Sequence, residues 1–369
     1  QSIASWLRLL DCTNVRQAMF AVRETPQPTL NWIFADREGH IGRQASGWIP
    51  RRRSGQSGLV PTPAWRRENH WDGWIAADQL PSSYDPAEGF VLSANESVNK
   101  PDGPIINTLF LPDYRYRRIR ERLAELPQAT IDDFKALQYD VVSLQARDLL
   151  KIFLPHLPAG TIKTRLENWS CQYTPESHEA SLFQRLYRNV ILEIFGQPSN
   201  GQGGIGWRRM FYLASRIGYS TMVITAIDAL LHKESSTWWH SRDKGAMIHA
   251  ACESIREKDD RPWSDVNAFR FTNRFFEGRR AGRLFGFHTG EFAMPGNHAT
   301  PFQGHLLRAA KRESTFAPSY HFVTDMSTDE AWTNLPGGPC ESRFSKYYKT
   351  DIARWSRGEY KLLAPTDAE

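Results

Sequence analysis

The sequence predicts an α+β fold, and three observations support this prediction. Short apolar runs bounded by Gly and Pro fill residues 30–92, helical periodicity dominates residues 130–257, and short strand-like runs return after Pro262. The elements therefore follow the order strands, helices, strands along the chain. This order is expected when two strand-rich regions share one sheet and the helices are inserted between them. With 369 residues, 40% of them hydrophobic, the chain can build a sizeable core.

The first thirty residues favour two short helices, over 2–10 and 14–23, with Thr13 as the expected N-cap of the second. An aromatic and branched run begins at Leu30. The turn residues 37–39 and a second run from Ile41 follow it, which is typical of a hairpin.

Two further segments complete the N-terminal region. Residues 51–70 are rich in Arg, Gly, Pro and Ser, so we expect a surface loop there. The run Phe90–Leu92 follows Gly89 and is expected to be another short strand, which would end next to Asn95.

The middle of the chain is predicted to be helical. Thr130–Asp133 resembles a capping box with Asp in place of Glu, and the apolar spacing after it predicts one helix that ends by Pro155. The remaining expected elements are a helix over 182–194, helices over 208–231 and about 243–257, a strand over 320–323 and an amphipathic piece over about 347–355.

Charge and hydropathy argue against a nucleic-acid interface and against a membrane span. The net charge is +5, but the basic residues occur only in short runs such as Arg51–Arg53, which favours solvated loops over a nucleic-acid interface. The most apolar stretch, Phe211–Leu231, contains Arg216 and Asp228 and is better interpreted as a core helix than as a membrane span.

Metal and redox motifs are weak. Cys12, Cys171, Cys252 and Cys340 lie far apart without a CxxC, so they are either free thiols or one or two disulfides. The eleven histidines show no metal-ligand spacing; His288 and Glu291 are close in sequence, but no other ligand type accompanies them.

The glycine-rich segment Gly201–Gly206 fits G-x-G-x-x-G. A predicted helix rather than a strand precedes it, so a flexible loop is the better interpretation than a dinucleotide site.

Asn95 is the strongest candidate for chemistry. An Asn amide can donate to a developing oxyanion, and one such donor contributes on the order of 3 kcal/mol to a transition state. The alternative is a simple turn residue after a strand. The surrounding order of residues favours the first interpretation: Asn31–Asp36, Gly39–Gly42, Gly47, Pro50–Arg51, Trp71, Gly73, Leu80–Pro81, Asp85–Pro86, Gly89 and Ala94–Asn95.

This order of residues resembles the β-subunit of the penicillin acylase family, which includes penicillin, cephalosporin and acyl-homoserine-lactone acylases. The likeness is thinnest between about 160 and 310. It continues after Asn95 in Tyr114–Ile119, Leu123, Thr130–Asp133, Leu137–Asp140 and Ser143. It returns near the end in Phe316–Tyr320, Asp325, Leu335–Pro339, Ser345, Tyr347, Trp355 and Gly358.

The resemblance implies a four-layer αββα N-terminal-nucleophile hydrolase fold, here incomplete, and an acylase that cleaves linear amides. In that family an N-terminal Ser attacks the carbonyl with its own α-amine as base. The resemblance places Asn95 in the oxyanion hole and, less directly, Arg118 as an orienting residue. It also implies periplasmic or secreted location and no catalytic cofactor. A structural calcium is possible, but Asp102 is offset from the family's ligand, so no metal ligand is assigned.

The same resemblance predicts that the nucleophile belongs to polypeptide upstream of Gln1, because Gln1 has neither hydroxyl nor thiol. The expected partners are therefore the upstream part of the β-subunit and an α-subunit from one precursor, besides a small acyl amide substrate. The chain alone is expected to be inactive. The alternative is a non-catalytic scaffold or binding relative. His40 and His321 depart from the family pattern and are interpreted as tolerated surface or packing changes.

Within this scheme, three segments are expected. Residues 1–118 form a strand-rich core segment that carries Asn95, residues 119–258 are mainly helical, and residues 259–369 return to the core as strands.

Overall fold

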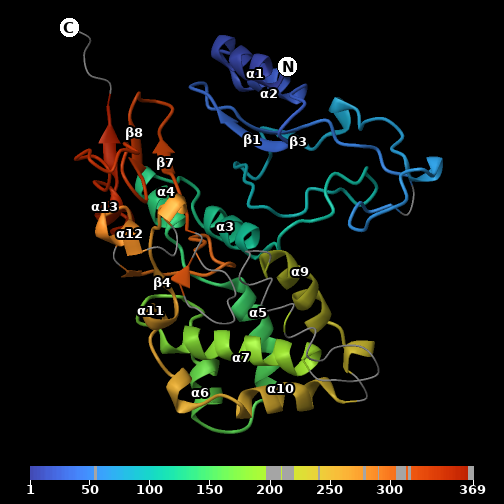
Figure 1. Ribbon diagram of the computed structural model, residues 1–369. Helices are drawn as coiled ribbons and strands as arrows, with labels where there is room; N and C mark the ends of the chain where they lie inside the picture. Colours follow the sequence, from blue (N-terminus) through green and yellow to red (C-terminus); the bar gives the residue numbers. More distant parts are fainter. Residues whose placement is uncertain are drawn as a thin grey trace. The chain divides into compact units, whose positions relative to one another are not determined.

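The computed structural model describes residues 1–53, 56–196, 209, 220–239, 242–276, 280–289, 291–304, 313–314 and 317–364 (Figure 1). The chain divides into two compact units. The first comprises residues 1–128 and 324–330, and the second comprises residues 129–323 and 331–364. The three segments expected from the sequence, 1–118, 119–258 and 259–369, stay a prediction.

The first unit combines two short helices with a three-stranded antiparallel sheet in the order β1-β2-β3. Its elements are α1 (Ser2–Leu7), η1 (Arg8–Asp11), α2 (Val15–Arg23), β1 (Leu30–Ala35), β2 (Ile41–Ser46), η2 (Arg67–Asn69), η3 (Ala77–Gln79), β3 (Ser82–Tyr84) and α3 (Tyr114–Ala124). The predicted hairpin is confirmed, and Gly39 supplies the positive φ of +89° that its turn requires.

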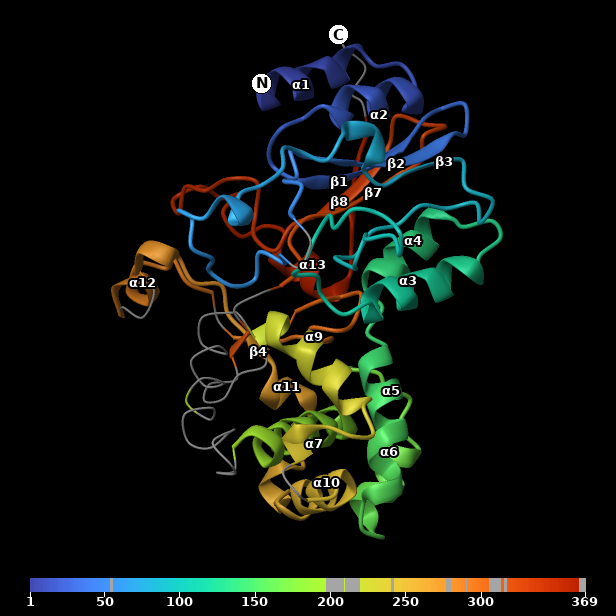
Figure 2. The ribbon, with the colours of Figure 1, turned by 90° about the vertical axis from the view of Figure 1, so that its right-hand side faces the viewer.

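Helix α2 lies directly on the sheet, as Figure 2 shows. A Cβ at Gly42 would lie 2.5 Å from the sulfur of Met19 and 2.6 Å from a methyl carbon of Val15, so the glycine permits this close approach. The cap of α2 is not Thr13 as expected. Asn14 accepts the backbone N–H of Gln17 at 3.0 Å, which leaves the Thr13 hydroxyl to bond the Gln17 side chain.

The predicted strand at Phe90–Leu92 is wrong, because these residues are irregular. The free edge of β2 is already taken by β3, which pairs through Gly42↔Tyr84 and Gln44↔Ser82. The carbonyl of Leu92 instead accepts a hydrogen bond from the Arg43 guanidinium at 3.3 Å. The Arg43 side chain therefore fixes this segment, which does not form the expected strand.

The second unit contains a helical lobe followed by short strands. Helix α4 (Ile131–Gln138) comes first. The helices of the lobe are α5 (Leu144–Phe153), η4 (Leu154–His156), α6 (Thr161–Glu167), α7 (His178–Phe195), α9 (Ser220–Leu231), η5 (Thr237–Trp239), α10 (Lys244–Glu253), η6 (Glu257–Asp259) and α11 (Trp263–Val266). Figure 1 shows α6 and α10 beside α7. The predicted helix at 182–194 is confirmed, and the one predicted at about 243–257 is present as α10 but ends earlier, at Glu253. Of the helix expected over 208–231, α9 is described, and most of 208–219 lies outside the described residues, as does Gly201–Gly206.

The single helix expected from 131 to 155 is broken into α4 and α5. Between them, the backbone N–H of Ser143 bonds the carbonyl of Cys171, and the N–H of Tyr173 bonds the carbonyl of Val141. The Ser143 hydroxyl then caps α5 by accepting the N–H of Ala146 at 3.2 Å. A pairing with residues thirty positions away therefore overrides the local helical pattern.

A polar group is buried in the core of this lobe. Asp228 on α9 accepts hydrogen bonds from the Tyr187 hydroxyl at 2.6 Å and from the Gln145 amide at 2.7 Å. All three residues are buried, so each polar atom in these bonds has exchanged water for a protein partner. The arrangement fixes α9 against α5 and α7.

The capping box at α4 is confirmed: the N–H of Asp133 donates to the Thr130 hydroxyl at 3.2 Å, and the N–H of Thr130 donates to the Asp133 carboxylate at 2.9 Å. We expect Thr130→Ala to lower the free energy of unfolding by about 1 kcal/mol, because it removes one acceptor of this reciprocal pair. Urea unfolding measures the change. Thr161→Ala is the matched control, since Thr161 begins α6 without a side-chain cap bond; an equal loss in both variants would contradict the capping account.

The C-terminal strands pair among themselves. The sheet orders are β5-β4-β6 and β7-β8-β9, with the strands β4 (Ala268–Phe269), β5 (Phe292–Ala293), β6 (Glu313–Ser314), β7 (His321–Thr324), β8 (Ala331–Asn334) and β9 (Lys361–Leu363). The expected single sheet shared with the N-terminal strands is not found among the described strands. The remaining elements are η7 (Arg274–Phe276), α12 (Arg280–Leu284) and α13 (Ile352–Arg357), the last beginning later than the predicted 347.

All four cysteines are free, which decides between the free thiols and the disulfides that the sequence left open. Cys171 and Cys252 are buried, and burial raises the pKa of the Cys171 thiol to about 11.

Within the described part of the chain, no helix has both the length and the apolar character needed to cross a bilayer.

Candidate functional site

Asn95 lies in a tight turn of the first unit rather than at the end of a strand. The backbone φ of Asn95 is +67°, in the left-handed region, and the residue is exposed. Asn adopts this conformation more readily than most residues, yet it still costs on the order of 1 kcal/mol. A backbone hydrogen bond from a later segment stabilises this turn: the carbonyl of Asn95 accepts the N–H of Leu111 at 3.0 Å.

Arg115, near the start of α3, contacts the Asn95 side chain. Its guanidinium donates to the amide oxygen of Asn95 at 3.0 Å. A guanidinium can only donate, so this bond fixes which end of the amide faces the arginine. The Asn95 NH2 group therefore points away from Arg115, and the neighbouring positive charge polarises the amide and makes the NH2 a stronger donor.

A buried carboxylate supports this pair. Burial lowers the pKa of the Arg115 guanidinium, and the negative charge of Glu96 opposes that shift. Glu96 itself accepts the backbone N–H of Ala94 at 2.7 Å and lies 3.4 Å from the guanidinium of Arg43. The residues on either side of Asn95 are thus tied to β2 and to their own turn, which holds the amide in one position.

Arg118, the orienting residue expected from the sequence, contacts Glu121 one turn along α3, at 2.8 Å. The contact to Asn95 comes from Arg115, which lies in the same run of arginines. Sequence reasoning did not single out Arg115, because a run with Arg at 115, 117 and 118 offers no local signal that selects one of them. Only the approach of α3 to the turn distinguishes them.

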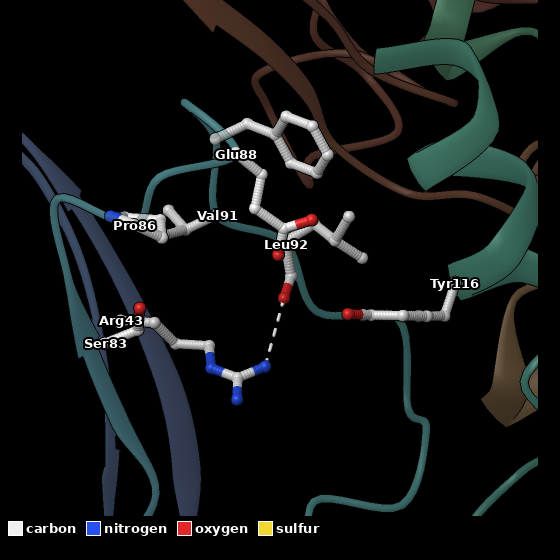
Figure 3. Close-up of a pocket in the computed structure, with 8 residues that line it drawn as sticks. Arg43, Ser83, Pro86, Glu88, Val91, Leu92 and Tyr116 are labelled. Carbon is white, nitrogen blue, oxygen red and sulfur yellow. Dashed lines mark hydrogen bonds between the residues drawn. The ribbon is translucent and has the colours of Figure 1, made fainter. Parts of the chain in front are cut away.

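A small hollow lies beside the segment that leads to Asn95 (Figure 3). Its volume is about 90 Å³, and it is lined by Arg43, Ser83, Pro86, Glu88, Phe90, Val91, Leu92 and Tyr116. This volume has room for a few water molecules and is well below the roughly 300 Å³ of a typical ligand pocket. The hollow can hold a small polar group, but it cannot by itself enclose an acyl chain.

The two histidines that depart from the family pattern have structural partners. His40 is half-buried, its Nδ1 lies 2.7 Å from the Asp85 carboxylate, and its ring stacks on Tyr84. His321 is buried, with Nδ1 2.8 Å from the Asn334 amide oxygen, and burial lowers its pKa. Both are polar contacts, the first within the first unit and the second within the second unit.

No metal ligand set emerges from the described residues, among which no group of three or more His, Cys, Asp or Glu side chains could hold an ion. Asp102 lies in an exposed turn. His288 and Glu291 do not converge, because His288 accepts the N–H of Asn273 while Glu291 pairs with Arg270.

Comparison with known proteins assigns the class. The family described as Penicillin amidase matches residues 1–369, and the chain belongs to this family. Its curated relatives are named acylases. An "Acyl-homoserine lactone acylase QuiP" of Pseudomonas fluorescens (strain Pf0-1) is 27% identical over 98% of this chain and 46% of its own length. A "Penicillin acylase 2 proenzyme" of Pseudomonas sp. (strain SE83) is 30% identical over 95% of this chain and 46% of its own length.

The fold agrees with this class. The solved structure of a thermostable penicillin G acylase from Alcaligenes faecalis matches 99% of this chain and 70% of that chain, with a TM-score of 0.61 and 17% identity. The expected α+β class is confirmed by the described helices and sheets, and this match shows that the chain shares the fold of that acylase structure. The chain spans just under half the length of the two curated relatives.

Proposed function

We propose that this chain forms part of an acylase that hydrolyses a linear amide, with Asn95 as an oxyanion-hole donor. The observation that carries the proposal is the Arg115–Asn95 bond. It leaves a polarised NH2 group, exposed and held in a strained turn, without using that group for packing. A turn residue needs no arginine to orient its amide, whereas a donor to a developing negative charge does benefit from one.

In the proposed reaction, a Ser hydroxyl supplied by another part of the precursor adds to the amide carbonyl carbon. The hydroxyl proton passes to the α-amine of that Ser and then to the leaving amine as the C–N bond breaks. Water then hydrolyses the acyl-Ser ester and regenerates the hydroxyl. Asn95 acts in both tetrahedral steps, because its NH2 hydrogen-bonds the oxygen that becomes negative. Arg115 acts through Asn95 as a positioning residue.

Other parts of the proposal rest on the resemblance to acylases. We propose that Arg118, through its pair with Glu121, stiffens α3 and so supports the position of Arg115. The partners would be the remaining β-subunit and an α-subunit of one precursor, in a periplasmic or secreted enzyme that needs no catalytic cofactor.

The test compares the 369-residue chain with the complete precursor on phenylacetyl and long-chain acyl amides, with release of the amine as the readout. We expect turnover by the precursor and none by the chain alone, because the chain supplies the oxyanion donor but no nucleophile. Turnover by the chain alone would place the nucleophile within it and contradict the proposal. An inactive but fully processed precursor would instead favour a non-catalytic scaffold.

A further inference from the structure

A second surface, in the other unit, carries apolar and basic side chains together. It is formed by α12 with the turn after it, residues 280–288, and by residues 341–349. The exposed apolar side chains are Leu284, Phe285 and Phe344, which are 81%, 59% and 92% exposed. We call these two segments the cationic apolar patch. Figure 2 shows α12, in orange, standing apart from α6, α7 and α10 of the same unit.

Four hydrogen bonds join the two segments of the patch. Arg343 donates to the carbonyl of Phe285 at 3.0 Å, and Tyr348 donates to the carbonyl of Phe287 at 3.1 Å. Lys349 donates to two further carbonyls, those of Gly286 and His288, at 3.0 and 2.9 Å. Cations at the carbonyl end of a helix are favourable, so α12 and the turn after it are well supported. The exposed apolar side chains therefore project from an ordered base.

The patch carries a net positive charge. The two segments contain five cations, Arg280, Arg283, Arg343, Lys346 and Lys349, and one carboxylate, Glu341. Among the described residues, no carboxylate forms an ion pair with Arg280, Arg283 or Lys346, and all three are exposed. Basic side chains around projecting apolar ones complement a surface that is anionic outside and apolar beneath.

We propose that the cationic apolar patch binds the surface of a lipid bilayer that contains anionic headgroups. Arg280, Arg283 and Lys346 would contact headgroup phosphates, while Leu284 and Phe344 enter the boundary with the acyl chains. A bilayer accepts side chains that project into it without a matching shape, whereas a protein partner needs a recess that fits them. The inference is independent of the acylase reaction, since it uses residues of the second unit alone.

The experiment uses the full-length protein and sedimentation with unilamellar vesicles, either of phosphatidylcholine alone or with about 30% phosphatidylglycerol. We expect binding to the anionic vesicles, little binding to the neutral ones, and release by salt. Arg283→Gln with Lys346→Gln should weaken partitioning by roughly 30-fold, since each basic residue near the surface contributes about fivefold. Leu284→Ser with Phe344→Ser should weaken it by on the order of 100-fold, since burial of each of these side chains contributes about tenfold or more.

Two controls separate a specific patch from a generally basic protein. Lys233→Gln with Lys258→Gln removes the same charge from exposed positions elsewhere in the second unit, and Leu10→Ser removes an apolar side chain that is 82% exposed in the first unit. Both controls should bind as the parent does. Equal weakening by the controls, absence of binding to anionic vesicles, or capture of an acidic protein without vesicle binding would each overturn the inference. The substituted side chains are exposed, so circular dichroism should show unchanged folding.

Discussion

In the complete protein, Asn95→Ala is expected to lower kcat by roughly 10²- to 10³-fold while changing KM little. The loss follows from removing a donor that bonds the oxygen only once it carries charge, so binding of the neutral ground-state amide is nearly unaffected. Asn95→Asp keeps the shape of the side chain and the bond from Arg115, but it has no N–H. We therefore expect it to be as impaired as the alanine variant. Steady-state amide hydrolysis measures both.

Arg115 provides the second half of this prediction. Arg115→Met should lower kcat less than Asn95→Ala does, because the donor remains but is no longer oriented. The double variant should be no slower than Asn95→Ala alone, since a positioning residue has nothing to position once the amide is gone. Asn168→Ala, a change of an exposed Asn in the other unit, is the control and should leave kcat unchanged. Additive losses for Asn95 and Arg115 would show that they act separately and would contradict the account.

Acid is expected to destabilise the second unit through His298. This histidine is buried, burial lowers its pKa to about 4, and neither ring nitrogen has a hydrogen-bond partner among the described residues. An unfolded chain binds the proton near the ordinary pKa of about 6.5, so below that pH the unfolded state holds more protons than the folded state. Stability is therefore full above pH ~6.5 and falls toward pH ~4, by about 3 kcal/mol from this residue.

Urea unfolding at several pH values tests this expectation. His298→Gln should remove most of the acid-dependent loss attributed to this site, even if it changes stability at neutral pH. Gln303→Ala is the control, because the Gln303 amide donates to the backbone carbonyl of His298 at 3.1 Å and carries no titratable group. That variant should shift stability equally at every pH. The prediction is wrong if the free energy of unfolding falls equally steeply with pH in the parent and in the His298→Gln variant between pH ~6.5 and ~4.

The sequence correctly predicted those elements whose structure depends on contacts between residues close in sequence. The hairpin of β1 and β2, the capping box at Thr130 and the amphipathic helix α7 each depend on residues close in sequence, and each is confirmed. The errors arise where distant residues compete. Residues 82–84 pair with β2 while the expected strand Phe90–Leu92 is irregular, and residues 171–173 interrupt the helix expected across residues 139–143.

In the candidate site, too, the sequence predicted the feature with a local signal and missed the one that depends on long-range packing. The sequence selected Asn95 because its context resembles an acylase segment, and the structure places its amide in an oriented, exposed turn. The sequence did not select Arg115, because which arginine of α3 meets the turn depends on the angle at which the helix approaches it. That angle is a property of packing, and no periodicity in residues 114–124 encodes it.

The central claim concerns where the NH2 group of Asn95 points when substrate is bound. A crystal structure of the complete protein with a boronate or phosphonate that mimics the tetrahedral intermediate measures this directly. The account predicts that the Asn95 NH2 lies about 2.7–3.1 Å from the oxygen that represents the oxyanion, while its carbonyl oxygen still accepts from Arg115. An amide turned away from that oxygen, or an oxyanion held by other groups with Asn95 in solvent, would contradict it.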